Sequence, residues 1–569
     1  MTLQAPFPSW LRGEHRGVAE AVTVGLLVAL MHVLFRLSAG FLVGVLNDDG
    51  VYVALGKAIA DGAGYRSIHL VGAPLQVRYP PGLPLLLAVP WALGGTLGAV
   101  RVTVAALHPI VAGGAAGLVW WMGRRHMQLP AWPLAICAIG PFLLDPVIQY
   151  FNIALTEPYL VFGWAGALVL AAPLCSPSSL APPPAEPSAG PPPPGRPGRA
   201  AALGLTLAAA TLFRTAGIAL IPGVLLALAV HRRWREAAVC AAALLAPLLL
   251  WEALQSYWMS RGPVSSQPDD LSYVRWLGAE APVAFAGFAA RAAATNVVEY
   301  VRKLAGYLFA SQRVGIAVVL TAALAAGLAC VRLWRSQTTL VLTTVFAVAL
   351  TLTWPYAQGR LLLPLLPFLG LLAASTWVAV DRWVRPPLAT PLRWGLQAAL
   401  GLAAIAVTLR QVELREAAGR SFQSGVLPAP QDFTPTLTLA VRSRFIYRVA
   451  QWVRAHTAPA DRIMVDAPAA VYLYTGRRTV AALPTERRVG SSTFDVPGRY
   501  LAERILVDSV TFLLWLPPGS GLENDLRTIQ ARCPRVLRPE AYDCPGCFRI
   551  DRDEGCLRRQ VLAAGGSPP

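Results

Sequence analysis

Long apolar segments recur along most of this chain and restrict the folds available to it. Segments of about 20 mainly apolar residues, enough to cross a bilayer as a helix, follow one another through residues 1–410. Only 14% of all residues are charged, against roughly a quarter in soluble domains. We therefore expect a mainly α, polytopic membrane protein.

We predict about eleven transmembrane helices. The first is expected to be retained, because its apolar run is longer than that of a signal peptide and has no clear small-x-small cleavage site. The predicted spans lie near 18–40, 99–122, 130–149, 157–174, 200–214, 216–231, 236–256, 313–332, 337–354, 360–380 and 391–410.

Short clusters of arginine set the expected orientation. Under this threading they all fall on one side, which the positive-inside rule makes the cytoplasm. The short connection between Asp145 and Glu157, assigned to the other side, has no Arg or Lys. A bacterial plasma membrane protein with a cytoplasmic N-terminus follows. The net charge of +18 is explained by this topology, and we expect no nucleic-acid partner.

Two domains are expected. Residues 1–410 form the transmembrane domain, with a first outer loop at 41–98, a proline-rich cytoplasmic linker at 176–199 and an outer loop at 257–312. Residues 411–569 form a small extracytoplasmic α/β domain. Its predicted strands are 462–466 and 509–515, and its predicted helices are 441–456 and 522–532.

Four cysteines lie in the last part of the second domain: Cys533, Cys544, Cys547 and Cys556. In an oxidising compartment an even set favours disulfides, which could pair in three ways. The Cys544-x-x-Cys547 pair with two flanking cysteines could instead hold zinc. Disulfides are the preferred interpretation.

The stretch NDDGVYVALGKAIADGAGYRSIHLVGAPLQVRYPPGLPLLL, residues 47–87, contains the most informative charges. Asp48 and Asp49 follow a long apolar segment and begin a helical pattern that stops at Gly62 and Gly64. Asn47, Asp48 or Asp49 could merely cap this helix. Their place at the outer membrane boundary, where acids are few, favours a chemical role.

Three further residues accompany these acids. Tyr52 lies four residues after Asp48 on the same helical face, either as a ligand contact or as an interfacial anchor. Arg78 is a cation just before the turn Tyr79-Pro80-Pro81, whose prolines set the chain direction. Glu157 opens the fourth predicted span, as a cap or as a second functional acid.

Two arginines run against the positive-inside bias. Arg214, in Phe213-Arg214-Thr215, and Arg360, in Gln358-Gly359-Arg360, fall on the outer side. Charges at membrane depth are functional candidates, although a long side chain can also reach the interface. A carboxylate that takes a proton from a hydroxyl, beside arginines that stabilise a phosphate leaving group, suits transfer of a sugar from a lipid phosphate.

The order of these motifs resembles the membrane glycosyltransferases with the C-type fold. The sequence is similar to the bacterial branch of glycosyltransferase family 39, which is related to protein O-mannosyltransferases and to aminoarabinose transferases. The resemblance covers about residues 15–410, and 471–477 is similar to the outer domain of some members. It rests on Asp48-Asp49-Gly50-Val51-Tyr52, Tyr79-Pro80-Pro81, Arg101, Thr156-Glu157-Pro158, Phe213-Arg214-Thr215 and Arg360-Leu361-Leu362-Leu363-Pro364.

The resemblance implies an inverting enzyme that uses a polyprenyl-phosphate-linked sugar and an acceptor hydroxyl of the cell envelope. Asp48 would be the base. Asp49, where the family often has Glu, would contact the acceptor or a metal, as would Glu157 and Tyr52. The lipid phosphate would be bound by Arg214, Arg360, Lys57 and Arg78. Some C-type enzymes need a divalent metal, and whether this one does stays open.

Two other classes of function are compatible with the chain. It could be a transporter or flippase of lipid-linked sugars, for which internal repeats and broken helices would be expected. It could also be a non-catalytic envelope assembly factor whose outer domain binds a partner.

Overall fold

The computed structural model describes most of the chain, and everything below concerns these residues. They are 14–39, 43–46, 48–175, 196–260, 282–354, 357–383, 435–482, 499–514, 522–539, 547–551 and 553–562, with isolated positions between 395 and 416. Asn47, most of the predicted linker 176–199 and most of the predicted span 391–410 therefore lie outside the described residues.

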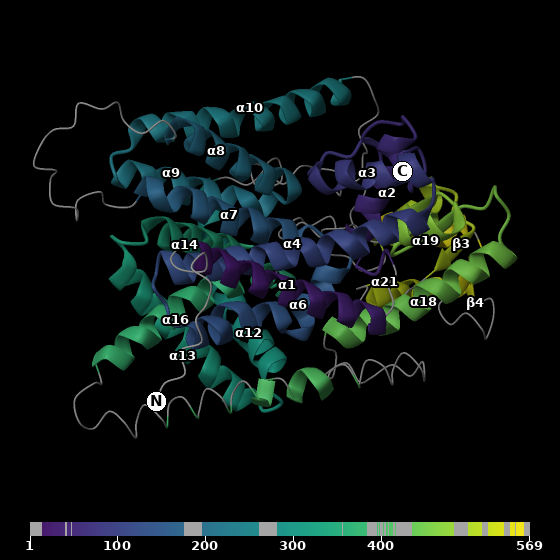
Figure 1. Cartoon of the computed structure of the whole chain (residues 1–569). Coiled ribbons are helices and arrows are strands. Elements are labelled where there is room, and N and C mark those ends of the chain that lie inside the picture. The colour runs from purple at the N-terminus through teal and green to yellow at the C-terminus, as the bar shows by residue number, and fades with distance from the viewer. Residues whose placement is uncertain are drawn as a thin grey trace, which may run out of the picture.

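Residues 14–383 form a bundle of helices (Figure 1). Its elements are α1 (Glu14–Ala39), α4 (Leu97–Arg125), α5 (Ala131–Leu134), η2 (Ala135–Ile139), η3 (Gly140–Leu143), α6 (Asp145–Asn152), α7 (Glu157–Cys175), α8 (Arg196–Phe213), η4 (Thr215–Ala219), α9 (Leu220–Val230), α10 (Trp234–Met259), α12 (Pro282–Leu308), α13 (Gln312–Leu333), α14 (Thr338–Thr353), α15 (Gly359–Leu362), η6 (Leu363–Leu365) and α16 (Leu366–Trp383).

Six helices within the described residues are long and apolar enough to cross a membrane: Gly17–Phe35, Leu97–Arg125, Glu157–Cys175, Trp234–Met259, Gln312–Leu333 and Gly359–Arg382. A seventh span is formed if Ala131–Leu143 and Asp145–Asn152, bent by 50°, count as one. The predicted spans 200–214, 216–231 and 337–354 are shorter apolar helices. The polytopic, mainly helical class is confirmed, while the number eleven stays a prediction.

Glycines let neighbouring helices of the bundle approach closely. A Cβ built on Gly25 of α1 would lie 2.8 Å from the carbonyl oxygen of Gly113 in α4, and one on Gly117 would lie 2.8 Å from that of Ala21. Between α8 and α10, a Cβ on Gly204 would lie 2.2 Å from the carbonyl oxygen of Cys240. Small residues at helix contacts are typical of membrane bundles, where packing replaces the hydrophobic effect.

The predicted first outer loop contains two helices, α2 (Asp48–Ala60) and α3 (Gly82–Gly94). The start of α2 at Asp48 agrees with the sequence pattern, and positive φ angles at Gly62 and Gly64 follow its end. The indole nitrogen of Trp91 donates to the Val53 carbonyl (3.1 Å) and holds α3 on α2. In Figure 1 both helices lie at the end of the bundle that faces the C-terminal domain.

The C-terminal region is an α/β domain, as predicted. Its five-stranded sheet has the order β2-β1-β3-β5-β4, parallel across β2, β1 and β3 and antiparallel across the rest. Its elements are α18 (Pro435–His456), β1 (Ile463–Val465), α19 (Pro468–Thr475), β2 (Thr479–Ala481), α20 (Arg499–Val507), β3 (Phe512–Leu514), α21 (Leu522–Arg532), β4 (Leu537–Pro539), β5 (Cys547–Ile550) and α22 (Glu554–Leu562).

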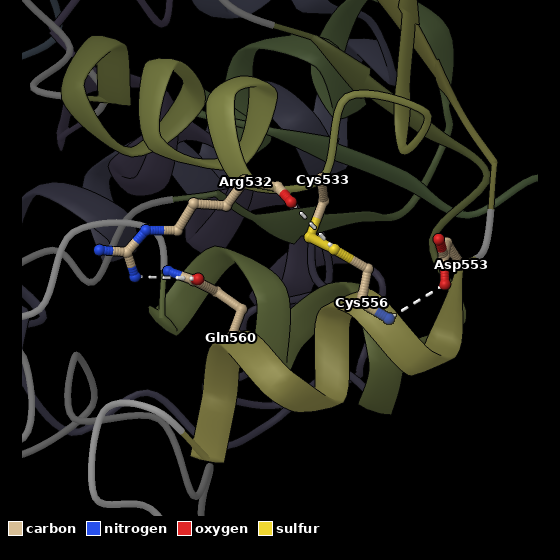
Figure 2. The surroundings of a disulfide bond; sticks show 5 residues. All are labelled: Arg532, Cys533, Asp553, Cys556 and Gln560. Carbon is tan, nitrogen blue, oxygen red and sulfur yellow. Dashed lines mark hydrogen bonds between the residues drawn. A yellow bond between two sulfur atoms is a disulfide. The ribbon is translucent and has the colours of Figure 1, made fainter.

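A disulfide links Cys533 at the end of α21 to Cys556 in α22 (Figure 2). Beside it, the Arg532 guanidinium donates to the side-chain oxygen of Gln560 (3.1 Å), and Cys556 N–H donates to Asp553 (3.0 Å). Cys547 is also disulfide-bonded. These bonds agree with the preferred interpretation of the cysteines as disulfides.

The structure corrects one boundary of the predicted loops and adds a helix to another of them. The predicted linker 176–199 is too long at its end, because α8 begins at Arg196. The predicted outer loop 257–312 includes the 27-residue helix α12, Pro282–Leu308. Hydropathy missed this helix because its charged residues, among them Arg291, Glu299, Arg302 and Lys303, interrupt the apolar pattern.

Candidate active site

Asp48, the first residue of α2, is held by two side chains from distant parts of the chain. The Tyr79 hydroxyl donates to Oδ1 of Asp48 (2.7 Å), and Nη2 of Arg360 lies 2.5 Å from Oδ2. The side chains of Asp48 and Arg360 are only 17% and 18% exposed. The structure thus joins three of the predicted motifs at one carboxylate.

Aromatic residues hold Tyr79 in place. The Tyr65 hydroxyl lies within hydrogen-bond distance of the carbonyl oxygens of Tyr79 (2.9 Å) and Pro80 (3.1 Å), so it donates to this turn. The ring of Tyr52 packs edge-on against Tyr79, with 5.2 Å between ring centroids. The turn therefore supplies more than chain direction, because it presents a hydroxyl to Asp48.

The surroundings of Asp48 keep it ionised. Burial alone would raise the pKa of Asp48. The positive charges of Arg360 and Arg78 and the hydrogen bond from Tyr79 outweigh this effect and hold the pKa below its usual value. Asp48 is therefore a carboxylate at neutral pH, able to accept a proton.

Asp49 lies in a different environment from Asp48. Its side chain is completely buried. Oδ2 accepts from the backbone N–H groups of Gly44 (2.6 Å) and Val45 (3.0 Å), and Oδ1 accepts from Leu46 (2.9 Å). Both oxygens are thus directed at the backbone of the preceding loop. This geometry does not support the predicted contact with an acceptor or a metal, and it gives Asp49 the role of ordering the loop before α2.

A second ion pair joins the start of α7 to the residue that follows the end of α8. Nη1 of Arg214 is 2.9 Å from Oε1 of Glu157 and donates to the Thr156 hydroxyl (3.1 Å). Glu157 is completely buried, and the Arg214 side chain is 11% exposed. The ring of Phe213 stacks on that of Tyr159 at 4.5 Å. The two sequence motifs Thr156-Glu157-Pro158 and Phe213-Arg214-Thr215 are therefore in direct contact.

The two ion pairs belong to one polar cluster. Arg360 interacts electrostatically with Glu157 as well as with Asp48, and Tyr150 is also among its neighbours. Tyr52 lies close enough to Asp48, Thr156 and Arg214 to be influenced by each of them. We call this set, Asp48, Tyr52, Tyr79, Tyr150, Glu157, Arg214 and Arg360, the central cluster.

Two predicted phosphate ligands are placed less favourably. Lys57 pairs with Asp61 (2.7 Å) and lies over the Trp91 ring, 5.2 Å from its centroid. It is nine residues after Asp48, about 13 Å along the helix axis, so the structure does not bring it into the central cluster. Arg78 is half-buried, lies beside the Tyr79 ring at 5.6 Å and acts on Asp48 through its charge.

Sequence reasoning missed Tyr79, Tyr65 and Tyr150 as parts of this region. Tyr79 was assigned only to a turn, because adjacent prolines explain its position without a role for its side chain. A possible signal was the number of tyrosines between Asp48 and Pro80, since a tyrosine buried beside a membrane needs a partner for its hydroxyl.

The C-terminal domain packs against the loop that carries these acids. Backbone N–H of Val43 donates to the Tyr474 hydroxyl (2.9 Å). A Cβ on Gly44, whose φ is +91°, would lie 2.4 Å from the Cβ of Ala470 in α19. Further along the first loop, Val71 N–H donates to the Thr479 carbonyl (3.1 Å) at the edge of the sheet. The loop around Asp49 is therefore completed by α19, while β2 supports the later part of the first loop.

Comparisons with known proteins give distant structural matches. No protein family and no curated protein matches the sequence. A crystal structure of ArnT from Cupriavidus metallidurans bound to undecaprenyl phosphate matches 95% of this chain and 98% of its own, at 14% identity and a TM-score of 0.48. A crystal structure of the Archaeoglobus fulgidus oligosaccharyltransferase, tethered to an acceptor peptide with the NVT sequon, matches 89% of this chain and 69% of its own, at 11% identity and a TM-score of 0.48. Likeness at this level establishes neither a family nor an activity.

A metal site does not fit the central cluster as it stands. In the part of the chain that the structure describes, no three His, Cys, Asp or Glu side chains come together as ligands. Asp48 contacts a hydroxyl and a guanidinium, and Asp49 faces backbone N–H groups. The chemistry below is therefore derived from the side chains alone.

Proposed function

We propose that this protein is an inverting glycosyltransferase that moves a sugar from a polyprenyl-phosphate carrier to a hydroxyl of a cell-envelope acceptor. The observation that carries the proposal is the ionised Asp48 held between the Tyr79 hydroxyl and the Arg360 guanidinium. A base and an anion-binding group lie side by side there, next to helices that can enter a bilayer.

The reaction assigns a role to each group. The acceptor oxygen attacks the anomeric carbon from the side opposite the phosphate, and the bond between that carbon and the phosphate oxygen breaks. The hydroxyl proton passes to Asp48, and the lipid phosphate leaves with the electron pair of the broken bond. Arg360 stabilises the leaving phosphate, with Arg214 and Arg78 as further cations of the same region. A single displacement inverts the anomeric centre.

Because Asp48 and Arg360 form an ion pair, donor binding precedes proton transfer in this mechanism. While Arg360 contacts Asp48, the pKa of this carboxyl is low and its basicity is weak. A donor phosphate competes for the same guanidinium. As Arg360 turns to the phosphate, the pKa of Asp48 rises and the carboxylate becomes a better base. Donor binding would thus activate the base before the acceptor reacts.

The proposed location is the outer face of a bacterial plasma membrane, with the C-terminal domain outside. The disulfide between Cys533 and Cys556 supports this placement, because such bonds persist in oxidising compartments. The arginine pattern of the short loops supports it independently. Accessibility of cysteines introduced at exposed positions of α18 to a membrane-impermeant thiol reagent in intact cells would test it.

The test of the activity is sugar transfer by the purified, reconstituted protein supplied with polyprenyl-phosphate sugars and envelope extracts. Asp48→Asn should lower the rate by about 10²- to 10⁴-fold, the usual contribution of a general base. Asp61→Asn is the matched control, since this acid follows the same helix but is 50% exposed and pairs with Lys57. Full transfer by Asp48→Asn would remove Asp48 as the base.

One observation favours a second candidate, a transporter or flippase of lipid-linked sugars. The span formed by Ala131–Leu143 and Asp145–Asn152 is bent by 50°, and broken helices occur in transporters. A flippase would move a fluorescent polyprenyl-phosphate sugar between leaflets of a vesicle without consuming it. Sugar transfer that requires Asp48, without lipid movement, would exclude this candidate.

A further inference from the structure

One face of α12 carries a row of four polar side chains. Asn296, Tyr300, Lys303 and Tyr307 are separated by four, three and four residues, so they lie along one side of the helix. Asn296, Tyr300 and Tyr307 are only 3%, 4% and 8% exposed. Buried polar groups need partners, and those of Asn296 and Lys303 lie on the segment that leads to Arg360.

The first contacts are made with the end of α14. Nδ2 of Asn296 donates to the carbonyl oxygens of Leu352 (2.8 Å) and Trp354 (2.7 Å). The last carbonyls of a helix have no partners within it, so Asn296 caps α14 from outside. This contact fixes where the chain leaves α14 and turns towards residue 360.

The next contacts are closer to the arginine. Nζ of Lys303 donates to the Ala357 carbonyl, which lies three residues before Arg360. This lysine uses its ammonium to hold a backbone carbonyl. The hydroxyl of Tyr300 lies near the Gln358 backbone.

The last contact is steric and involves the residue directly before Arg360. A Cβ built on Gly359 would lie 2.4 Å from the Tyr307 hydroxyl oxygen, 3.4 Å from the adjoining ring carbon and 3.6 Å from the next. Only the hydroxyl is in serious conflict, because the other two distances are ordinary contacts. Tyr307 is itself held through its carbonyl, which accepts from Nε2 of Gln411 (2.9 Å).

We propose that this face of α12 is a positioning element for Arg360, with Asn296, Lys303 and Tyr307 as positioning residues for the phosphate-binding guanidinium. The inference rests on the proposed role of Arg360 towards a lipid phosphate. Arg360 must reach both Asp48 and the phosphate with a planar group, and a displacement near 1 Å can cost about a hundredfold in rate. Contacts at residues 352, 354, 357 and 359 restrict such a displacement.

Gly359→Ala tests the steric contact. The measurement is binding of farnesyl phosphate to the detergent-purified full chain, with farnesol as the control that lacks the phosphate. We expect Gly359→Ala to weaken farnesyl phosphate binding at least about tenfold, since the added methyl moves Arg360. Tyr307→Phe sets the baseline, and the double variant Gly359→Ala/Tyr307→Phe should return to that baseline because the conflicting oxygen is gone.

A cycle with Arg360→Gln separates positioning from general damage. If Gly359→Ala acts through Arg360, it should have no further effect on farnesyl phosphate binding in the Arg360→Gln background. A further loss there, or no rescue by Tyr307→Phe, would overturn the positioning role. Equal binding by wild type and Gly359→Ala would overturn it as well. Wild type that does not prefer farnesyl phosphate to farnesol would instead remove the phosphate site of the proposed function, and the positioning role with it.

Lys303→Met tests the positioning of Arg360 through the loss of a single hydrogen bond. It removes one hydrogen bond to the Ala357 carbonyl, so farnesyl phosphate binding should weaken about three- to tenfold. Arg302→Met is the matched control, because Arg302 is the neighbouring cation but is 59% exposed and faces Glu299. An equal effect of the two variants would mean that charge alone matters and would contradict positioning by Lys303.

Discussion

Asp48 and Asp49 are adjacent in the sequence and occupy opposite environments. Asp48 faces side chains, the Tyr79 hydroxyl and the Arg360 guanidinium, and keeps part of its surface exposed. Asp49 is completely buried and faces three backbone N–H groups. One helical step rotates the side chain by about 100°, which separates the two carboxylates.

The difference shows how one short stretch can combine chemistry and structure. A carboxylate whose partners are mobile side chains can exchange them for a substrate. A carboxylate whose partners are backbone N–H groups fixes the loop in which they lie. We infer that Asp49 orders residues 44–46 so that Asp48 is presented at a defined position.

The largest expected difference is between Asp48→Asn and Asp49→Asn. The first should lower the rate of sugar transfer by about 10²- to 10⁴-fold. The second should lower the unfolding temperature in detergent, because hydrogen bonds to a charged acceptor contribute about 1.5–3 kcal/mol. Loss of transfer in Asp49→Asn with an unchanged unfolding temperature would show a chemical role for Asp49. It would contradict the division into a chemical Asp48 and a structural Asp49.

Glu157, which is completely buried and paired with Arg214, adds a third environment to the comparison of Asp48 with Asp49. Arg214→Met leaves Glu157 buried without its cation and should cost about 3 kcal/mol in stability. Arg214→Met/Glu157→Gln should recover much of this loss, as measured by thermal unfolding. If the double variant is stable yet does not bind farnesyl phosphate, Arg214 contributes to phosphate binding in addition to its structural pairing.

Tyr79→Phe should have the smallest effect. Its hydroxyl helps to lower the pKa of Asp48, so removal should raise this pKa. Because transfer requires ionised Asp48, the acid limb of the pH–rate profile should move to higher pH. An acid limb that stays in place, or moves to lower pH, would show that another group controls it.

Much of the fold could be predicted because periodicity and hydropathy report directly on burial. The start of α2 at Asp48 followed from the acids before an apolar pattern, and the strands at β1 and β3 from short β-branched and aromatic runs. Arg214 and Arg360 were found because charge at membrane depth is costly. These signals come from residues that are close together in the chain, so a single sequence is enough to detect them.

The rest depends on which distant segments meet. The family resemblance implied Lys57 as a phosphate ligand, but α2 carries it to Asp61 and Trp91. Tyr79 looked like part of a turn until Asp48 was placed beside it. The polar row of α12 could not be interpreted from the sequence, because its neighbours at positions 352, 354, 357 and 359 are known only from the structure.

The contact between Val43 and Tyr474 also has a consequence for the timing of biosynthesis. The two residues are separated by 431 positions, and translation proceeds at roughly 5–20 residues per second. The loop that presents Asp48 therefore lacks its last supports for about 20 to 90 s after it has emerged. Under the proposed function, a chain whose last domain has not folded would be inactive and would not consume the lipid carrier.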